Sequence, residues 1–324
     1  MILVTGATGF LGSELIKQLH GQGLRVRALK RSNSSIPPIL LNLTDIEWFN
    51  ADILDYFALE KAFEGITHVY HCCGLISFHS RDKKNMLRVN MEGTAYIVDL
   101  CLSHQITKLV HVSSVAALGD SKTNSPVIEK DIWEFNGTQH GYSISKYEGE
   151  MEVWRGIAEG LNAVIVNPSV IIGKNAGKEG SGKLFDLVRQ GISYYTPGSL
   201  GLVDVEDVAK VMITLMESAI TSERFIINSA NWSYKNLFAE IAKRLNIPVP
   251  KKEISKFQLS AGLWLATLAA LFTGKKQELT RDTVKSAFQN ALYSANKLHQ
   301  FFPNLTLKPI AVSINEITDH FRTS

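Results

Sequence analysis

The chain has 324 residues, 45% of them hydrophobic and 20% charged, with a formal net charge of +3 at pH 7. This length suits one large domain or two modest ones, and the scattered Lys and Arg residues do not suggest a nucleic-acid surface. Three cysteines are too few for a disulfide framework, and the Cys and His spacings complete no tetrahedral metal site. We therefore expect reduced thiols, no metal and a cytoplasmic protein.

Nothing in the sequence predicts targeting or membrane insertion. A strand pattern starts at residue 2, so no signal peptide is expected before it. The longest apolar run, 259–272, is shorter than the ~20 residues that a transmembrane segment needs. We expect a buried helix or a lid helix there, with a helix on a membrane surface or against a partner as the alternative.

The first predicted strand, 2–4, runs directly into a glycine-rich turn. Gly6, Gly9 and Gly12 follow the spacing G-x-x-G-x-x-G. The first permits a tight turn, the second lets a pyrophosphate approach the backbone, and the third lets the next helix pack closely on a sheet. That helix, 12–20, would direct its N-terminal amides at phosphates. This context predicts a dinucleotide site, with a purely structural turn as the alternative.

Strand and helix patterns then alternate through the first half of the chain. Such alternation predicts a parallel sheet with helices on both faces. We expect further strands at 25–29, 46–50, 68–71, 109–113 and 163–167. We expect the helices of this half at 56–63, 86–103 and 142–159.

The regular alternation of strand and helix patterns ends after Pro168. We expect a glycine-rich loop at 173–182, a strand at 225–228 and helices at 185–190, 206–218, 235–245 and 310–321. The predicted fold class is α/β: a Rossmann, doubly wound parallel sheet with a smaller, mostly helical C-terminal substrate-binding region. The dinucleotide-binding domain would cover 1–168, with part of the chain after 203 returning to it. The substrate-binding cap would lie mainly in 169–324.

A tyrosine and a lysine four residues apart begin the helix after the fifth strand. Tyr142 and Lys146 would share one face of that helix. A free tyrosine has a pKa of about 10, and a nearby ammonium group favours the phenolate and lowers that pKa. The pair is common by chance, but its place after a dinucleotide motif predicts a general acid–base tyrosine. Ser113 and Ser114 end the fifth strand, where a hydroxyl could hold a substrate oxygen; capping of the strand end is the alternative.

Together these segments resemble the extended short-chain dehydrogenase/reductase family of the NAD(P)-dependent epimerase/dehydratase superfamily. They look most like its bacterial members that are similar to dihydroflavonol 4-reductase. The resemblance covers nearly the whole chain and implies the fold and cofactor more specifically than the substrate. It is carried by Thr5–Gly12, Asp52–Ile53, Val69–Gly74, Val89–Thr94, Val112–Ser114, Tyr142–Lys146 and Asn167–Val170.

The resemblance also implies roles for individual residues. Tyr142 would transfer the proton, Lys146 would lower its pKa and bind the nicotinamide ribose, and Ser114 rather than Ser113 would be the catalytic hydroxyl. Asn90 would brace the site. Asp52 and Ile53 would flank the adenine, residues 168–170 would line the nicotinamide, and residues 73 and 74 would replace the usual alanine pair beside the cofactor. The implied cofactor-binding residues are Gly6, Thr8, Gly9, Phe10, Leu11, Gly12, Asp52, Ile53, Cys73, Gly74, Tyr142, Lys146, Pro168, Ser169 and Val170.

The end of the second strand indicates which dinucleotide is preferred. An acidic residue there would bind the ribose 2′-hydroxyl of NAD, whereas this chain has Lys30 and Arg31. An arginine can bind the 2′-phosphate of NADP with two parallel hydrogen bonds. We expect NADP(H), with NAD(H) less favoured, Arg31 as the phosphate ligand and Lys30 simply solvated.

The substrate is predicted only as a class. In this superfamily, enzymes that act on nucleotide sugars place an arginine before a strand of the second domain, where this chain has Gly201 and Leu202. Apolar stretches at 75–78, 192–195 and 259–272 favour an apolar or aromatic pocket, with core packing as the alternative. We expect an oxidoreductase acting on a small carbonyl or alcohol. A nucleotide-sugar epimerase or dehydratase with retained NAD, and a non-catalytic dinucleotide-binding protein, are the alternatives.

The sequence does not determine the oligomeric state or the roles of three histidines. The two long helices pair between subunits in many relatives, so a homodimer is an expectation from analogy of fold. His79, His111 and His140 have no spacing that specifies a role. His111 is expected in the core, His140 near the substrate and His79 in a polar loop over the site.

Overall fold

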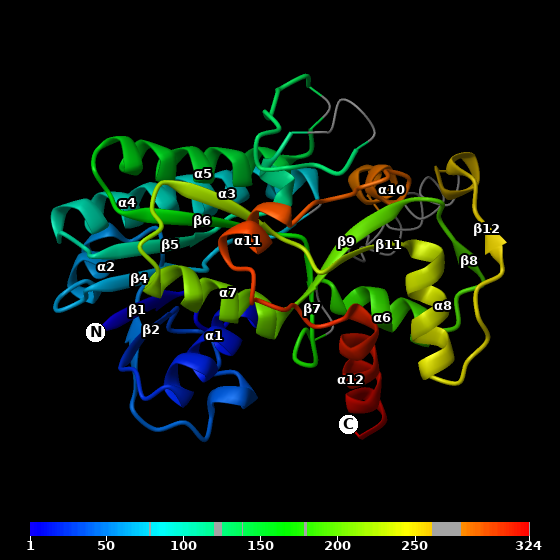
Figure 1. The fold of residues 1–324 in the computed structure, drawn as a ribbon, viewed down its shortest axis with the longest axis horizontal. Helices are drawn as coiled ribbons and strands as arrows, with labels where there is room; N and C mark the ends of the chain where they lie inside the picture. The colour runs from blue at the N-terminus through cyan, green and yellow to red at the C-terminus, as the bar shows by residue number, and fades with distance from the viewer. Residues whose placement is uncertain (78, 120–124, 138, 178–179, 261–279, 324) are drawn as a thin grey trace.

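The computed structural model describes residues 1–324 except 78, 120–124, 138, 178–179, 261–279 and 324. The helix expected at 259–272 therefore lies outside the described residues from 261 onward. Helices cover both faces of a central sheet, and a second group of short strands and helices lies beyond one end of it (Figure 1).

The central sheet has seven parallel strands in the order β10-β6-β5-β4-β1-β2-β3. The strand order reverses between β1 and β4, and such a switch point opens a crevice at the carboxyl ends of the strands. The predicted α/β, doubly wound fold class is thus confirmed. The strands are β1 Ile2–Thr5, β2 Val26–Lys30, β3 Ile46–Asn50, β4 His68–His71, β5 Lys108–Val112, β6 Ala163–Pro168 and β10 Glu223–Ile227.

Two layers of helices sandwich this sheet. One face is covered by α1 (Phe10–Gly21) and α7 (Val205–Glu217), and the other by α2 (Tyr56–Ala62), α4 (Gly93–Ser103) and α5 (Gly141–Ala158). Every residue of β5 and β6 is buried. Strands covered on both faces need apolar side chains in both directions, which explains why most residues of β5 and β6 are aliphatic.

The long helix predicted at 86–103 is divided by a π turn. Its parts are α3 (Lys83–Leu87), the π turn η3 (Arg88–Glu92) and α4. Asn90 in this turn is 3% exposed, and Gly149 of α5 packs so closely on its carbonyl oxygen that a Cβ would collide with it. The turn therefore forms where two helices touch at their backbones, a contact that helical periodicity does not reveal.

The C-terminal part contains strands that the sequence did not predict. β7 (Val170–Ile172), β9 (Ser199–Asp204) and β11 (Ala230–Ser233) form one sheet, and β8 (Tyr194–Tyr195) pairs with β12 (Lys252–Glu253). β9 carries a glycine, and β7, β8 and β12 are two or three residues long, so their patterns are weak. The remaining helices are α6 Gly182–Arg189, α8 Tyr234–Arg244, α10 Arg281–Ala287, α11 Asn296–Phe301 and α12 Ile310–Thr323. The 3-10 turns are η1 Pro38–Leu40, η2 Ser80–Asp82 and η4 Val115–Ala117.

The chain passes between the two regions more than once. After β9 it returns to the central sheet as α7 and β10, and then leaves it again for β11 and α8. The C-terminal region has its own core, which includes Phe185, Leu237 and Ile314. Within the described parts of the chain, no helix combines the length and the apolar character needed to cross a membrane.

Candidate active site

The predicted site residues gather at one edge of the central sheet. Thr5 of β1 pairs with His71 of β4, and Val112 of β5 pairs with Val166 of β6, so these strands end side by side. Because all the strands are parallel, the segments that follow them meet at this edge. The glycine turn, the 72–74 segment and the two serines all leave the sheet there.

The glycine turn has the geometry that a phosphate site requires. Gly6 has φ +64°, and a Cβ on it would stand 2.7 Å from the Cys72 carbonyl carbon and from the Cys73 nitrogen. A Cβ on Gly12 would collide with the carbonyl oxygen of Gly6. Gly9 is the N-cap of α1 and has no side chain to satisfy the first helical amides. The start of α1 thus leaves backbone N–H groups available to an anion.

The other residues of this turn differ in exposure. Thr8 and Phe10 are half-buried, and Leu11 is buried in the core between α1 and the sheet. Phe10 contacts the C-terminal region, since a Cβ on Gly173 would lie 3.1 Å from its Cζ. The turn therefore adjoins both regions of the molecule.

Asp52 and Ile53 follow β3 at the same edge. Asp52 is exposed, and its Oδ1 accepts a hydrogen bond of 2.9 Å from the Leu54 backbone nitrogen. Ile53 is 6% exposed and packs against Gly93 of α4. A carboxylate held in a turn and a buried apolar side chain are the two surfaces that an adenine site needs.

Arg31 is exposed directly after β2. Its neighbour Lys30 donates from Nζ to the carbonyl oxygen of Ser34 at 3.2 Å, so Lys30 is bound to this loop and is not simply solvated as expected. Burial raises the pKa of the Cys73 thiol to about 11, with smaller effects from the charges of Lys146, Asp52 and Arg31.

The structure brings Ser114, and not Ser113, to Tyr142. The Ser114 hydroxyl lies close enough to the Tyr142 phenol to lower its pKa by hydrogen bonding. The hydroxyl of Ser113 is buried and has no hydrogen-bond partner among the described residues. Lys146, one turn after Tyr142 on α5, is 7% exposed and donates from Nζ to the carbonyl oxygen of Val112 at 3.0 Å.

The pKa of the tyrosine does not behave as the sequence predicted. Burial raises the pKa of Tyr142, and the hydrogen bond with Ser114 opposes that rise only in part. Burial also lowers the pKa of Lys146 to about 8, against the opposing effects of Cys73, Cys72 and Glu150. The expected fall in the tyrosine pKa is therefore wrong for the protein chain alone, because loss of water around the phenol outweighs the hydrogen bond with Ser114.

Asn90 braces the site from the π turn. Its Oδ1 accepts from the Leu75 nitrogen at 2.7 Å, and its Nδ2 donates to the Leu75 oxygen and to Ser145 Oγ, each at 2.9 Å. Ser145 Oγ in turn donates to the Tyr142 carbonyl oxygen at 2.8 Å. One side chain thus links the segment after β4 to the first turn of α5.

The sequence did not predict a buried chain of polar groups beneath the glycine turn. Thr5 Oγ1 and His71 Nδ1 share a hydrogen bond of 2.7 Å, and His71 Nε2 and Thr94 Oγ1 share one of 3.0 Å. Burial lowers the pKa of His71 to about 3, so its ring is neutral in the folded protein. The carbonyl oxygen of Asn90 accepts from Thr94 Oγ1 at 2.6 Å, which joins this chain to the π turn.

The remaining histidines have separate positions. His111 is 2% exposed in β5, as expected of a core histidine. His140 is the N-cap of α5, where its Nδ1 accepts from the Ser143 nitrogen at 3.2 Å. His79 lies in the loop before η2, and its backbone nitrogen donates to Ser77 Oγ.

Pro168, Ser169 and Val170 occupy the junction between the two sheets. Pro168 ends β6, Ser169 is 5% exposed and Val170 begins β7. Of the stretches expected to form an apolar pocket, Ile192 and Tyr195 pack into the C-terminal core. Phe78 and 261–272 lie outside the described residues.

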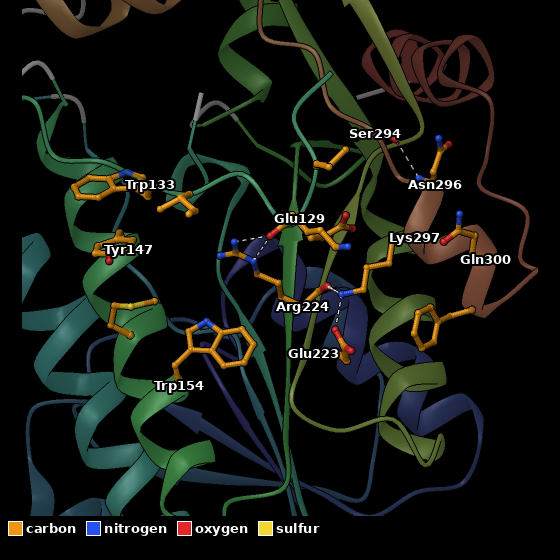
Figure 2. Close-up of a pocket in the computed structure, with 15 residues that line it drawn as sticks. Glu129, Trp133, Tyr147, Trp154, Glu223, Arg224, Ser294, Asn296, Lys297 and Gln300 are labelled. Carbon is orange, nitrogen blue, oxygen red and sulfur yellow. Dashed lines mark hydrogen bonds and ion pairs between the residues drawn. The ribbon is translucent and has the colours of Figure 1, made fainter. Parts of the chain in front are cut away.

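A cavity of about 750 Å³ lies away from this site. It is bounded by α5, the 128–133 segment, the start of β10 and α11 (Figure 2). Glu223 and Arg224 are the first residues of β10, so the cavity is near the opposite ends of the strands from the glycine turn. None of the predicted catalytic or cofactor-binding residues lines it.

Comparison with known proteins gives this arrangement a family. The pattern of the NAD dependent epimerase/dehydratase family matches residues 2–228. The chain belongs to this family. A putative dihydroflavonol 4-reductase of Synechocystis sp. is 30% identical over 92% of this chain and 88% of its own length. The anthocyanidin reductase of Arabidopsis thaliana is 27% identical over 82% of this chain and 86% of its own length.

A solved structure has the same fold. The crystal structure of the UDP-glucose 4-epimerase of Thermus thermophilus, in complex with NAD, superposes with a TM-score of 0.78. It is 18% identical and covers 100% of this chain and 99% of its own. The resemblance inferred from the motifs is thus confirmed, and the protein is an enzyme that uses a nicotinamide dinucleotide to act on CH–OH or carbonyl groups.

The residues present fit this cofactor. The uncapped start of α1 and the absence of Cβ atoms at Gly6 and Gly12 leave a cradle that any larger residue would fill. A Cβ on Gly74 would lie 3.0 Å from Lys146 Nζ, so this glycine also keeps space open beside the lysine. A dinucleotide of the family would lie along this edge, with its central pyrophosphate at the glycine turn and its nicotinamide end beside Lys146.

Proposed function

We propose that the protein is an NADP(H)-dependent oxidoreductase that reduces a ketone or aldehyde, or oxidises the corresponding alcohol, on a moderately apolar small molecule. The observation that carries this proposal is the placement of the Ser114 hydroxyl beside the Tyr142 phenol, with Lys146 one helical turn away on α5. A hydroxyl, a phenol and an ammonium group at the carboxyl edge of a dinucleotide fold suit proton transfer to a carbonyl oxygen.

Ser114, Tyr142 and Lys146 would each have a separate role in the reaction. Ser114 would donate a hydrogen bond to the substrate oxygen, and Tyr142 would give that oxygen its proton. Burial raises the tyrosine pKa, which keeps the phenol protonated as a proton donor must be. Lys146 would stabilise the phenolate left behind, because opposite charges attract strongly in a buried site. The reduced nicotinamide, when bound, supplies the hydride for the carbonyl carbon.

Arg31 supports NADP(H) over NAD(H). It is exposed at the end of β2, where a carboxylate would be expected in an NAD-specific site. Lys30 is bound to the carbonyl oxygen of Ser34, so it helps to close the loop and leaves Arg31 as the cation for a 2′-phosphate. The guanidinium group can form two parallel hydrogen bonds with such a phosphate.

The C-terminal region supports a substrate without a diphosphate group. A Cβ on Gly201 would stand 2.5 Å from Asn228 Oδ1, so this position in β9 cannot hold a larger side chain, and Leu202 is fully buried. The related reductases named above agree with an apolar substrate. The family name favours the alternative, an epimerase or dehydratase with retained NAD. However, this chain has no arginine at positions 201 and 202, where such an enzyme would bind the diphosphate of its substrate.

We also propose the two-domain division at residue 168, a homodimer formed through the helices at 86–103 and 142–159, and a cytoplasmic location. The separate C-terminal core supports the division. The dimer rests on analogy of fold.

The direct test is NADPH oxidation with a panel of aromatic and aliphatic ketones and aldehydes. Tyr142→Phe should lower kcat by about 10²-fold or more, the usual contribution of a general acid. Tyr147→Phe is the matched control, because Tyr147 lies on the same helix but stacks on Trp133 at the distant cavity. Unchanged activity in Tyr142→Phe would refute the proposal, and tightly bound NAD in the purified protein would favour the epimerase.

A further inference from the structure

A fully buried carboxylate lies on the same helix as the proposed catalytic pair. Glu150 follows Lys146 by one turn of α5 and is 0% exposed. Its Oε2 accepts from Asn167 Nδ2 at 2.7 Å, and its Oε1 accepts from Arg224 Nη1 at 2.9 Å and from Trp154 Nε1 at 3.3 Å. A buried carboxylate is tolerated only when it is paired and hydrogen-bonded, and these three donors supply that pairing.

Asn167 connects this carboxylate to the proposed catalytic serine. Besides the bond to Glu150, its Nδ2 donates to the backbone carbonyl oxygen of Ser114 at 3.0 Å. Its Oδ1 has no hydrogen-bond partner among the described residues. Reversing the amide would place this oxygen against two acceptors, the Glu150 carboxylate and the Ser114 carbonyl. Glu150 therefore determines which way the Asn167 amide faces, and Asn167 in turn holds the backbone of Ser114.

The other end of the network is anchored at the distant cavity. Arg224 donates from Nε and Nη2 to the carbonyl oxygen of Glu129 at 2.9 and 2.6 Å, as the dashed lines in Figure 2 show. Arg224 and Trp154 both line that cavity, and both reach Glu150 behind its wall. The anchor thus comes from the edge strand β10 and the 128–133 segment, independently of the glycine turn.

We propose that Glu150 and Asn167 are positioning residues that hold the Ser114 backbone, and hence its hydroxyl, toward Tyr142. The backbone of Ser114 is extended, with φ −163° and ψ 154°, at the point where β5 gives way to η4. A residue at such a transition is not fixed by a regular ladder on both sides, so the bond from Asn167 constrains it. This inference rests on the proposed function, because it assigns Ser114 a part in the reaction.

The test is a double-mutant cycle on kcat. Asn167→Ala should lower kcat by about 10-fold to 10²-fold, the range expected when a catalytic group is misplaced. The Asn167→Ala variant retains the Glu150–Arg224 ion pair, so it can still test the proposal if Glu150→Gln does not fold. Glu150→Gln should have a similar effect, because its amide group would face the donors of Asn167 or Arg224. Glu152→Gln, at a half-buried position of the same helix where the carboxylate pairs with Arg155, is the control and should leave kcat unchanged.

The decisive arm uses Ser114→Ala as the background. If Asn167 acts through the serine hydroxyl, Asn167→Ala should change kcat by less than about twofold in that background, since effects on one unit are not additive. An equal loss in both backgrounds would show a general structural role and overturn this inference alone. If Ser114→Ala itself keeps full activity, the proposed function fails and this inference with it. KM for NADPH should stay within about twofold throughout, because the phosphate cradle is untouched.

Discussion

The Nζ atom of Lys146 donates a hydrogen bond to the backbone carbonyl oxygen of Val112, the last residue of β5. The lysine of the helix is thereby fixed to the strand that leads to Ser114, two residues further on. One buried ammonium group therefore relates α5 to β5, and the position of Tyr142 relative to Ser114 depends on both elements.

Replacement of this lysine should affect catalysis far more than folding. Lys146→Met keeps the length of the side chain but removes the charge that would stabilise a tyrosine phenolate. We expect kcat to fall by about 10²-fold or more, as for loss of general acid–base assistance. Steady-state NADPH oxidation measures the effect, and Lys61→Met at an exposed position of α2 is the control. A kcat within twofold of the unmodified protein would contradict the role given to Lys146.

Arg31 should determine the preference between the two dinucleotides. Arg31→Ala should raise the Kd for NADPH by about 10-fold to 100-fold, which corresponds to a charged hydrogen bond worth about 1.5–3 kcal/mol. The Kd for NADH should not change, because NADH lacks the 2′-phosphate. Fluorescence titration measures both constants, and Arg25→Ala, just before the start of β2, is the matched control. Equal binding of both cofactors, unaffected by Arg31→Ala, would show that this arginine is not the phosphate ligand.

The third glycine of the turn should tolerate no side chain. A Cβ on Gly12 would collide with the Gly6 carbonyl oxygen, so Gly12→Ala should destabilise the protein by about 1–3 kcal/mol, as overpacking does, and weaken dinucleotide binding. Gly21 ends the same helix and has open space around its Cβ position. Gly21→Ala should be neutral or stabilising by up to about 1 kcal/mol. Urea unfolding with and without NADPH distinguishes the two variants. Equal free energies of unfolding for Gly12→Ala and Gly21→Ala would contradict the close contact between Gly12 and the Gly6 carbonyl oxygen.

Two buried histidines should make the protein sensitive to acid. Burial lowers the pKa of His71 to about 3, and burial together with His71 and Lys146 holds the pKa of His111 well below its ordinary value. The unfolded chain takes up these protons below about pH 6.5, whereas the folded protein does not. The free energy of unfolding should therefore be fully present above about pH 6.5 and decrease as pH falls toward about 3, by up to about 1.4 kcal/mol per pH unit for each histidine.

His111→Leu should make this decrease shallower, because it removes one of the two groups. Urea unfolding at several pH values between 7 and 4 measures the slope, and His104→Gln, at an exposed position, should leave it unchanged. An identical slope in His111→Leu and in the unmodified protein would mean that His111 takes up no proton on unfolding.

The structural features that the sequence predicted correctly share a property, because each depends on residues that are close together in the chain. Strand 46–50 and strand 68–71 were predicted with the bounds that the structure has, since short segments with apolar and aromatic residues between turn residues identify strands. The pairing of Tyr142 with Lys146 follows from helical geometry alone. By contrast, β9 was missed because Gly201 weakens its pattern, although that glycine is required by close contact with Asn228 and Ser169.

By itself, the sequence determined the α/β class, the glycine cradle, the basic residue after β2 and the tyrosine–lysine pair, because each is a pattern formed by neighbours in the chain. Only the tertiary structure decided the rest. It raised the tyrosine pKa by burial, placed Asn90 in a π turn and connected Glu150 through Asn167 to Ser114. These features depend on which distant segments exclude water from one another and meet within hydrogen-bond distance. Spacing along a single chain does not contain that information.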